Sequence, residues 1–249
     1  NSIMQSNKPK IIVQFNEANF DLIEEYCKNH DLVGFKKILK QPTKFKTTSE
    51  DTYENLEPWI QWYSFYTNMP FDQHRVFHLG DCLKNNHSNF IEDIADQDHK
   101  VGIFGSMNLK PSNKYNIYIP DAWTESKSDG SFSSKLVHKS TRYLVNNNAR
   151  LKINLSSILG LIILVGFPNK IIDIKMIFKA FRSVIDRSRS KLASILDYYF
   201  MKYATSRIKK KSLDYSLIFL NGFAHVQHHY LLSSSHIEGS NPEWYVKKK

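Results

Sequence analysis

Four short apolar runs, each followed by polar or turn residues, constrain the fold of this chain most strongly. The runs are residues 10–15, 101–105, 115–119 and 215–220. Helical patterns separate them, near residues 18–40, 57–67, 88–99 and 131–148. Short apolar runs of this kind are typical of buried strands, and their alternation with helices is typical of a parallel sheet. The sequence therefore predicts an α/β fold with a mostly parallel central sheet and helices on both faces.

The length and composition fit one globular domain of this type. The 249 residues are 41% hydrophobic and 13% aromatic, which is enough to bury a large core. Nine of them are glycine, about half the usual share of roughly 7%, and no dinucleotide or P-loop glycine motif occurs. Cys27 and Cys82 form no CxxC pair, so neither a disulfide framework nor a thiolate zinc site is indicated. A reducing, cytoplasmic compartment fits this cysteine usage best.

The fourth apolar run ends in a cluster of histidines. Residues 215–220 are followed by His225, His228 and His229. Ligands gather beyond the carboxyl ends of strands in open α/β sheets, and imidazole is a common metal ligand. If a helix begins after Gly222, His225 and His229 lie on one face at four-residue spacing and can converge on one ion. The alternative is that the histidines are polar residues at a strand exit or hydrogen-bonded interior groups.

The first apolar run ends in a carboxylate. Residues 10–15 lead to Glu17, and a helical pattern follows. Glu17 is a candidate metal ligand, or an acidic residue that complements the dipole of the following helix. If the first and fourth runs end at one switch point of the sheet, Glu17 lies close to His225 or His229.

Three segments together resemble the alkaline phosphatase superfamily, and within it the nucleotide pyrophosphatase/phosphodiesterase and sulfatase-like proteins. They are the first run with its terminal acid, LEPWIQWYSFYTNMPFDQHRVFHLGD (56–81) and AHVQHHY (224–230). Members carry a strand-terminal Asp, then a Thr, Ser or Cys nucleophile at a helix start with a proline two residues later. A Thr-Gly, a Pro-x-x-His and an Asp-x-x-x-His pair of metal ligands follow.

The match to these motifs is partial but ordered along the chain. In this chain the corresponding residues are Glu17 near the strand-terminal acid, Thr67-Asn68 near the Thr-Gly, Pro70 with His74 near the Pro-x-x-His, and His225 with His229 at the spacing of the ligand pair. The resemblance implies an alkaline phosphatase-like domain that hydrolyses or transfers a phosphate or sulfate ester with a divalent metal, zinc or manganese. Members place a second Asp-His pair and a last metal-binding His farther on. We therefore expect the chain to cover about the amino-terminal half of a typical member, with a second metal site beyond Lys249.

The position of the family nucleophile holds no hydroxyl or thiol. Whether the motif is aligned on its proline or on its Thr-Gly, Leu56, Glu57 or Pro58 stands there. Glu57 then acts as a ligand or an unusual carboxylate nucleophile, or a nearby hydroxyl such as Thr52 or Ser49 takes this role, or catalysis is lost. Glu57 also fits the first turn of a helix as an ordinary stabilising acid.

Residues 151–211 differ from the rest of the chain. LSSILGLIILVGF is shorter than the roughly 20 apolar residues that span a bilayer, so it predicts a buried or interfacial helix. Residues 170–211 contain twelve Lys or Arg and three Asp, which accounts for +9 of the chain's net charge of +10. Their apolar residues recur at helical spacing. The cationic face is either a solvated surface of a cap or lid, or a contact for anionic lipid head groups or a polyanionic substrate.

The sequence thus predicts one alkaline phosphatase-like α/β domain over residues 1–249 with a basic helical insertion at 151–211. Its expected function is metal-dependent hydrolysis or transfer of a phosphate or sulfate ester. The candidate residues are Glu57 for catalysis and Glu17, His225 and His229 for the metal. The alternative is a catalytically degenerate binding module that engages an anionic surface or partner. The expected partners are an anionic ester and an anionic membrane surface, because no nucleic-acid-binding motif accompanies the charge.

Overall fold

One parallel sheet organises the chain, whose computed structural model describes residues 8–146, 155–166, 171–185 and 189–230. The strands are β1 (Lys10–Phe15), β2 (Val101–Phe104), β3 (Ile117–Ile119) and β4 (Tyr215–Leu220). They pair in the order β1-β4-β2-β3, and every neighbouring pair is parallel. The predicted α/β class with a parallel sheet is confirmed.

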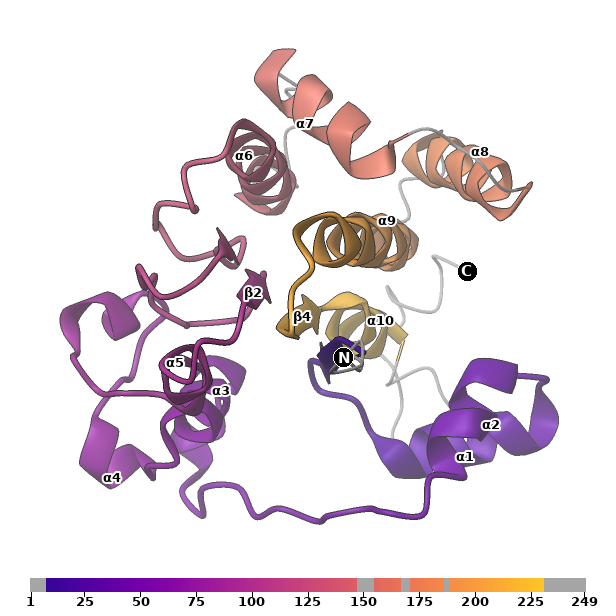
Figure 1. Ribbon diagram of the computed structural model, residues 1–249. Coiled ribbons are helices and arrows are strands. Elements are labelled where there is room, and N and C mark those ends of the chain that lie inside the picture. Colours follow the sequence, from indigo (N-terminus) through magenta and orange to yellow (C-terminus); the bar gives the residue numbers. More distant parts are fainter. Residues whose placement is uncertain (1–7, 147–154, 167–170, 186–188, 231–249) are drawn as a thin grey trace, which may run out of the picture.

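Helices cover both faces of the sheet (Figure 1). One face packs against α3 (Pro58–Thr67) and α5 (Phe90–Ala95), and the other packs against α6 (Phe132–Asn146), α7 (Leu155–Val165) and α9 (Arg189–Lys211). Neighbouring residues of a strand point to opposite faces. Accordingly, Leu217 belongs to the core cluster of Tyr66 on α3, whereas Ile218 belongs to that of Tyr199 on α9. The remaining elements are α1 (Phe20–Asn29), α2 (Val33–Leu39), α4 (Phe71–His74), α8 (Ile171–Ile185), α10 (Gly222–Tyr230) and the short 3-10 helices η1 (Tyr53–Asn55) and η2 (Asp81–Lys84).

β4 is the central strand, and its apolar sequence follows from that position. It pairs with β1 on one side and with β2 on the other, and five of its six residues are buried. A strand that is covered on both faces is continuously apolar, whereas a half-exposed strand alternates. Because all four strands are parallel, their carboxyl ends lie at one edge of the sheet. We call this the carboxyl edge; it comprises residues 16–17, 105–106, 120–123 and 221–228.

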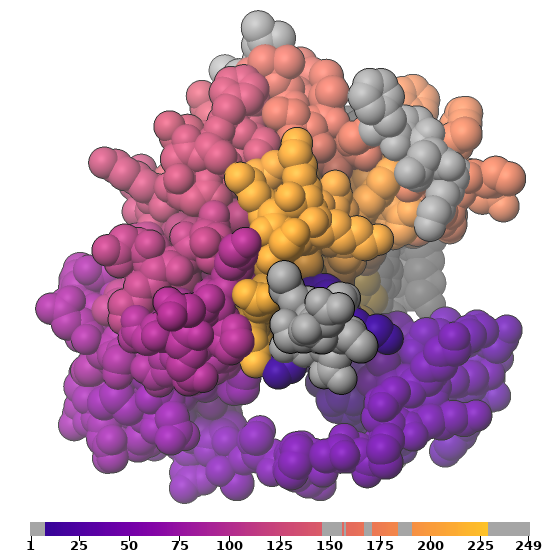
Figure 2. All heavy atoms as spheres, viewed as in Figure 1, coloured from indigo at the N-terminus to yellow at the C-terminus, as the bar shows by residue number. Residues whose placement is uncertain are grey.

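The predicted helical pattern near residues 18–40 forms two helices. α1 ends where His30 adopts an extended conformation and donates its N–H to the Tyr26 carbonyl, and α2 begins three residues later. Phe35 of α2 packs edge-on against Phe223 of α10, with ring centroids 5.4 Å apart, and Phe223 packs against Phe15 of β1 at 5.6 Å. These rings hold α2 beside the end of β1. An extended, exposed connection from α2 to η1 then leads the chain to the other side of the molecule (Figures 1 and 2).

The basic segment is helical wherever the structure describes it, and part of it builds the core. The buried face of α9 includes Ile195, Phe200, Ala204 and Ile208, which lie in the same cluster as Ile218 of β4. α8 and α7 pack outside α9 (Figure 1). Residues 189–211 therefore cover the sheet as well as carrying positive charge. No helix in the described ranges is both long and apolar enough to cross a membrane.

A glycine permits the close approach of α7 to α6. A Cβ at Gly160 would overlap Ser140 Oγ and the Leu136 carbonyl oxygen, whereas a Cβ at Gly34 of α2 meets nothing within 4 Å. Both positions are helical. Replacing each glycine by alanine therefore separates two effects: at Gly34 it changes helix propensity alone, and at Gly160 it also changes the packing of α7 on α6.

We expect Gly160→Ala to lower the free energy of unfolding by about 1–3 kcal/mol, because the new methyl group overpacks the α6–α7 contact. Gly34→Ala should raise it by up to about 1 kcal/mol, since alanine is the better helix former and the site is open. Urea denaturation of the two variants and the wild type measures both changes. Equal effects of the two substitutions would contradict the packing of α7 on α6.

Candidate active site at the carboxyl edge

Two asparagines lock the ends of β1 and β4 together. Asn16 follows β1, and its buried side chain donates to Asn221 Oδ1 at 2.8 Å. Trp62 of α3 donates its indole N–H to Asn16 Oδ1 at 2.9 Å. The backbone N–H of Asn16 also donates to the Leu220 carbonyl at 3.0 Å. Because amide side chains carry both donors and acceptors, this network satisfies the polar groups where the two strands end.

Glu17 meets a histidine of α10 directly beside this network. Its Oε2 lies 2.6 Å from His228 Nε2, and the side chain of Gln227 donates to its backbone carbonyl. Glu17 has a φ of 55°, a left-handed conformation that is uncommon for a residue other than glycine. The two side chains are 29% and 66% exposed, so solvent and small solutes can reach both.

The predicted adjacency of the first and fourth runs is confirmed: β1 and β4 are neighbours, and a helix begins at Gly222. The α10 histidine whose contact with Glu17 the structure describes is His228. The closeness of Glu17 to His225 or His229 stays a prediction. The side chain of His229 lies outside the described residues. Successive residues of a helix are about 100° apart around its axis, so the phase of α10 decides which histidine faces β1.

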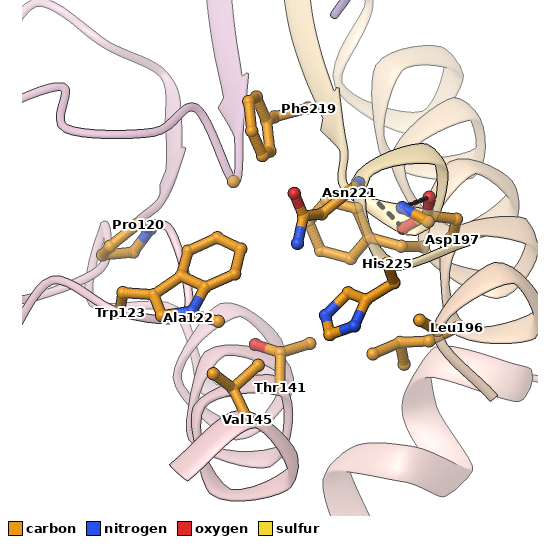
Figure 3. A pocket seen from close by; sticks show the side chains of 14 residues that line it. Pro120, Ala122, Trp123, Thr141, Val145, Leu196, Asp197, Phe219, Asn221 and His225 are labelled. Atoms are coloured by element: carbon orange, nitrogen blue, oxygen red, sulfur yellow. Dashed lines mark hydrogen bonds between the residues drawn. The ribbon is translucent and has the colours of Figure 1, made fainter. Parts of the chain in front are cut away.

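His225 lies in an open pocket of about 570 Å³ between the carboxyl edge and α6, α9 and α10. Figure 3 shows the rings of His225 and Trp123 pointing into this pocket from opposite sides. Thr141, Phe200 and Asn221 complete much of its wall. Aromatic and apolar surface with a few polar groups is typical of small-molecule sites. His225 and His228 are three residues apart on α10, so the pocket and the Glu17–His228 pair lie within about one helical turn.

The amino end of α10 is held by an internal carboxylate. Asp197 of α9 accepts the backbone N–H of Gly222 at 2.6 Å and that of Asn221 at 3.3 Å. A Cβ at Gly222 would lie 2.6 Å from Asp197 Oδ2, so glycine allows this approach. Burial raises the pKa of Asp197 to about 6, while the two N–H donors act in the opposite direction. A carboxylate at a helix amino end also complements the helix dipole. Asp197 therefore positions α10 and its histidines.

The amino end of α3 lies at the carboxyl edge of the sheet. Tyr66 hydrogen-bonds Gln14 within β1 at 3.0 Å, and Trp62, one turn earlier, hydrogen-bonds Asn16 beyond the end of β1. The helix thus runs antiparallel to the strands, and its first residues extend past the carboxyl edge. Glu57, the candidate catalytic residue, is the exposed N-cap of α3, and its side chain does not cap the helix.

His74, which stands near the Pro-x-x-His motif of the alkaline phosphatase superfamily, has a structural role in this chain. His74 is 1% exposed, and its Nδ1 accepts the Val76 N–H at 3.0 Å. Nε2 therefore carries the ring proton and donates to Ser64 Oγ at 2.9 Å. With its lone pair engaged, His74 is unable to take a proton from Ser64. Burial lowers the pKa of His74 to about 4, so the ring is neutral at pH 7.

The side chains at the carboxyl edge include atom types that bind divalent metals. Carboxylate oxygen and imidazole nitrogen are both zinc and manganese ligands, and Glu17 and His228 present one of each. Catalytic zinc sites usually have three protein ligands. In the part of the chain that the structure describes, no group of three or more His, Cys, Asp or Glu side chains is arranged to hold a metal ion.

No family model, curated protein or solved structure matches this chain. The resemblance to the alkaline phosphatase superfamily therefore depends on the ordered motifs alone. Among the residues that build the site, Asn16 and Asn221 were marked in the sequence by their place immediately after apolar runs. No sequence pattern marked Asp197, because its partners lie 24 and 25 residues away.

The stability of the fold should depend on pH through His74. Its pKa is about 4 in the folded protein and about 6.5 in an unfolded chain. As the pH falls from 6.5 to 4, the unfolded chain binds a proton that the folded protein does not, so this contribution to stability is present above pH 6.5 and is lost toward pH 4. We expect His74→Gln to be less stable at pH 7, by about 1–3 kcal/mol, and to lose less stability than the wild type on acidification.

Denaturant unfolding of both proteins at pH 7, 5.5 and 4.5 measures this difference. The matched control is His30→Gln, because His30 is exposed at the end of α1. The control should keep the wild-type dependence on pH. A His74→Gln variant with the same dependence as the wild type would show that His74 is not the buried neutral group described above.

Proposed function

We propose that the carboxyl edge is the active site of a hydrolase or transferase that acts on a phosphate or sulfate ester with a divalent metal. The contact of 2.6 Å between Glu17 Oε2 and His228 Nε2 carries this proposal. It joins side chains from two adjacent strand ends, and Glu17 adopts an uncommon backbone conformation in making it. Such backbone conformations cost free energy and persist only where the surrounding structure holds them. They cluster at functional sites.

Zinc or manganese is the proposed cofactor, with Glu17 and His228 as its first two ligands. His225 and His229 remain proposed further donors from the same helix, as their spacing in the sequence suggests. A bound divalent ion would polarise an ester oxygen and stabilise the charge that develops in the transition state. Asp197 acts indirectly, since it holds the first turn of α10 and thereby the orientation of the histidines.

The nucleophile is the second part of the proposal. Glu57 stands at the amino end of α3, where the family carries its Thr, Ser or Cys, and the positive end of the helix dipole favours an anionic substrate there. As a carboxylate, Glu57 would attack the ester centre or serve as a ligand. Thr52 and Ser49 are the nearby hydroxyl alternatives, and both are exposed.

The pocket beside His225 suits the organic part of the ester. Its wall combines Trp123 and Phe200 with the polar groups of Thr141 and Asn221. An ester group that extends from this pocket along one turn of α10 would reach Glu17 and His228. Flat apolar substituents such as nitrophenyl groups are therefore suitable first substrates, because they can stack on the indole ring of Trp123.

We expect the full-length protein to bind zinc or manganese, and Glu17→Gln and His228→Ala to weaken that binding at least tenfold, because each removes a proposed ligand. The matched control is His99→Ala, because the ring of His99 packs at a tilt against Tyr215, at the opposite end of β4 from the site. The control should bind metal as the wild type does. Equilibrium dialysis followed by elemental analysis measures the affinity. Unchanged affinity in both ligand variants would remove Glu17 and His228 from the site.

Hydrolysis assays should separate the roles of the carboxylates. With 4-nitrophenyl phosphate, bis(4-nitrophenyl) phosphate and 4-nitrophenyl sulfate, we expect activity that a chelator abolishes and that Glu17→Gln reduces about 100-fold or more. If Glu57 is the nucleophile, Glu57→Gln lowers kcat without changing metal content. If Glu57 is a ligand, metal content falls as well. Loss of activity in Thr52→Ala or Ser49→Ala, with an active Glu57→Gln, would assign the nucleophile to a hydroxyl.

The second candidate function is a catalytically degenerate binding module. The absence of a hydroxyl or thiol at Leu56, Glu57 and Pro58 favours it. Such a module needs no metal and would use its basic surface to engage an anionic partner. A full-length wild type that binds no metal and hydrolyses none of the three esters would favour this function over the enzyme.

A further inference from the structure

Helix α8 turns its polar and small residues toward the protein. Asp173 and Ser183 are buried, and Met176 and Ala180 are partly buried against the core beneath α9. Spacings of three and four residues place all four on one face of the helix. Lys202 of α9 neutralises Asp173 through a contact of 2.9 Å. The described inner face of α8 is therefore held by a buried ion pair, two small residues and Met176, whereas its large isoleucine and phenylalanine side chains are exposed.

The opposite face of α8 is apolar and exposed. Ile171, Phe178 and Phe181 are 74%, 70% and 66% exposed. Among the residues of this helix whose exposure the structure describes, the exposed large apolar ones are Ile171, Ile172, Ile174, Ile177, Phe178 and Phe181. An amphipathic helix on the surface of a globular protein normally buries its apolar stripe. α8 does the reverse, so its outer face is suited to a contact outside the chain.

α7 extends this surface. Its inner face packs through Gly160 and Leu164, while Ile158, Leu159 and Ile162 are exposed. Both helices pack against α9 from outside and form the outermost layer on this side (Figure 1). We call these nine exposed residues of α7 and α8 the α7–α8 apolar patch. Large exposed apolar side chains gathered on one side of a protein mark interaction sites.

Charge beside the patch indicates what covers it. Lys175, Lys179 and Arg182 are exposed and lie at helical spacing along one flank of the apolar stripe of α8. Asp173 is the one acidic residue of α8, and it is buried and paired; α7 has no acidic residue. Among the described residues of α7 and α8, the large apolar side chains are flanked by cations and by no exposed carboxylate, and such a face complements a bilayer surface that contains anionic lipid. The described parts of α7 and α8 are too short to cross the bilayer.

We propose that the α7–α8 apolar patch inserts into the interfacial layer of a membrane that contains anionic lipid. Phe178, Phe181 and the exposed isoleucines enter the boundary between head groups and acyl chains, and Lys175 and Lys179 contact the lipid phosphates. The two helices lie in the plane of the membrane, with α9 and the sheet behind them. This placement does not depend on the proposed catalytic function.

Vesicle flotation of the full-length protein tests the proposal. We expect binding to phosphatidylcholine vesicles with about 30% phosphatidylserine, and at least tenfold weaker binding to phosphatidylcholine alone. Binding to the anionic vesicles should weaken in 1 M salt, where the Debye length falls from about 10 Å to about 3 Å. Phe178→Ser with Phe181→Ser, and separately Lys175→Glu with Lys179→Glu, should each weaken binding about tenfold or more.

Matched controls come from α6, which the proposal leaves outside the contact. Phe132 is 72% exposed, and Lys135 is exposed on the same helix. Phe132→Ser and Lys135→Glu should bind vesicles as the wild type does, as should Glu17→Gln. Circular dichroism melting verifies that all variants fold.

Two outcomes would overturn the proposal. One is equal binding to both kinds of vesicle, or binding that the Phe178 and Phe181 substitutions leave unchanged. The other is a wild type that does not bind vesicles but forms a dimer in solution that those substitutions dissociate. In that case a second copy of the chain covers the α7–α8 apolar patch.

Discussion

Parallel hydrogen bonding of β4 between β1 and β2 is the constraint on which the rest of the structure depends. It pairs residues about 200 positions apart, such as Phe15 and Leu220. The parallel direction requires long crossovers, and these supply the helices that bury both faces of the sheet. It also places every strand end at one edge, so that Glu17 and His228 of α10 meet although they are distant in sequence.

Polar groups at this edge divide into those that hold the structure and those that remain available for chemistry. Asn16, Trp62 and Asn221 satisfy one another, and Asp197 occupies the amino end of α10. Glu17 and His228 form the pair that solvent reaches. A rigid, fully hydrogen-bonded frame beside an accessible carboxylate and imidazole is the arrangement that catalytic sites use to fix reactive groups. The ester chemistry proposed above would use this accessible pair.

On the side of the sheet opposite α3 and α5, the inner helix α9 and the outer helix α8 bury different kinds of side chain. α9 buries apolar side chains against the sheet, as an ordinary amphipathic helix does. α8, packed outside it, buries Asp173 against Lys202 and exposes phenylalanine and isoleucine. Burying an ion pair contributes little net stability compared with apolar packing. This orientation leaves the outer face of α8 available as the contact surface proposed above.

The amino-acid sequence by itself determined the α/β class, the location of all four strands and of most helices, and the cluster of histidines at a strand end. These features are local: the periodicity of apolar residues specifies an element and the face that it can bury. The sequence left open whether a helix starts after Gly222, and the structure shows that α10 begins there. Only the tertiary structure decided that Glu17 contacts His228, that Asp197 holds α10, and that α8 faces outward with its apolar side. Each of these depends on strand register and on the rotation of a helix about its axis, which distant parts of the chain set through packing and hydrogen bonding.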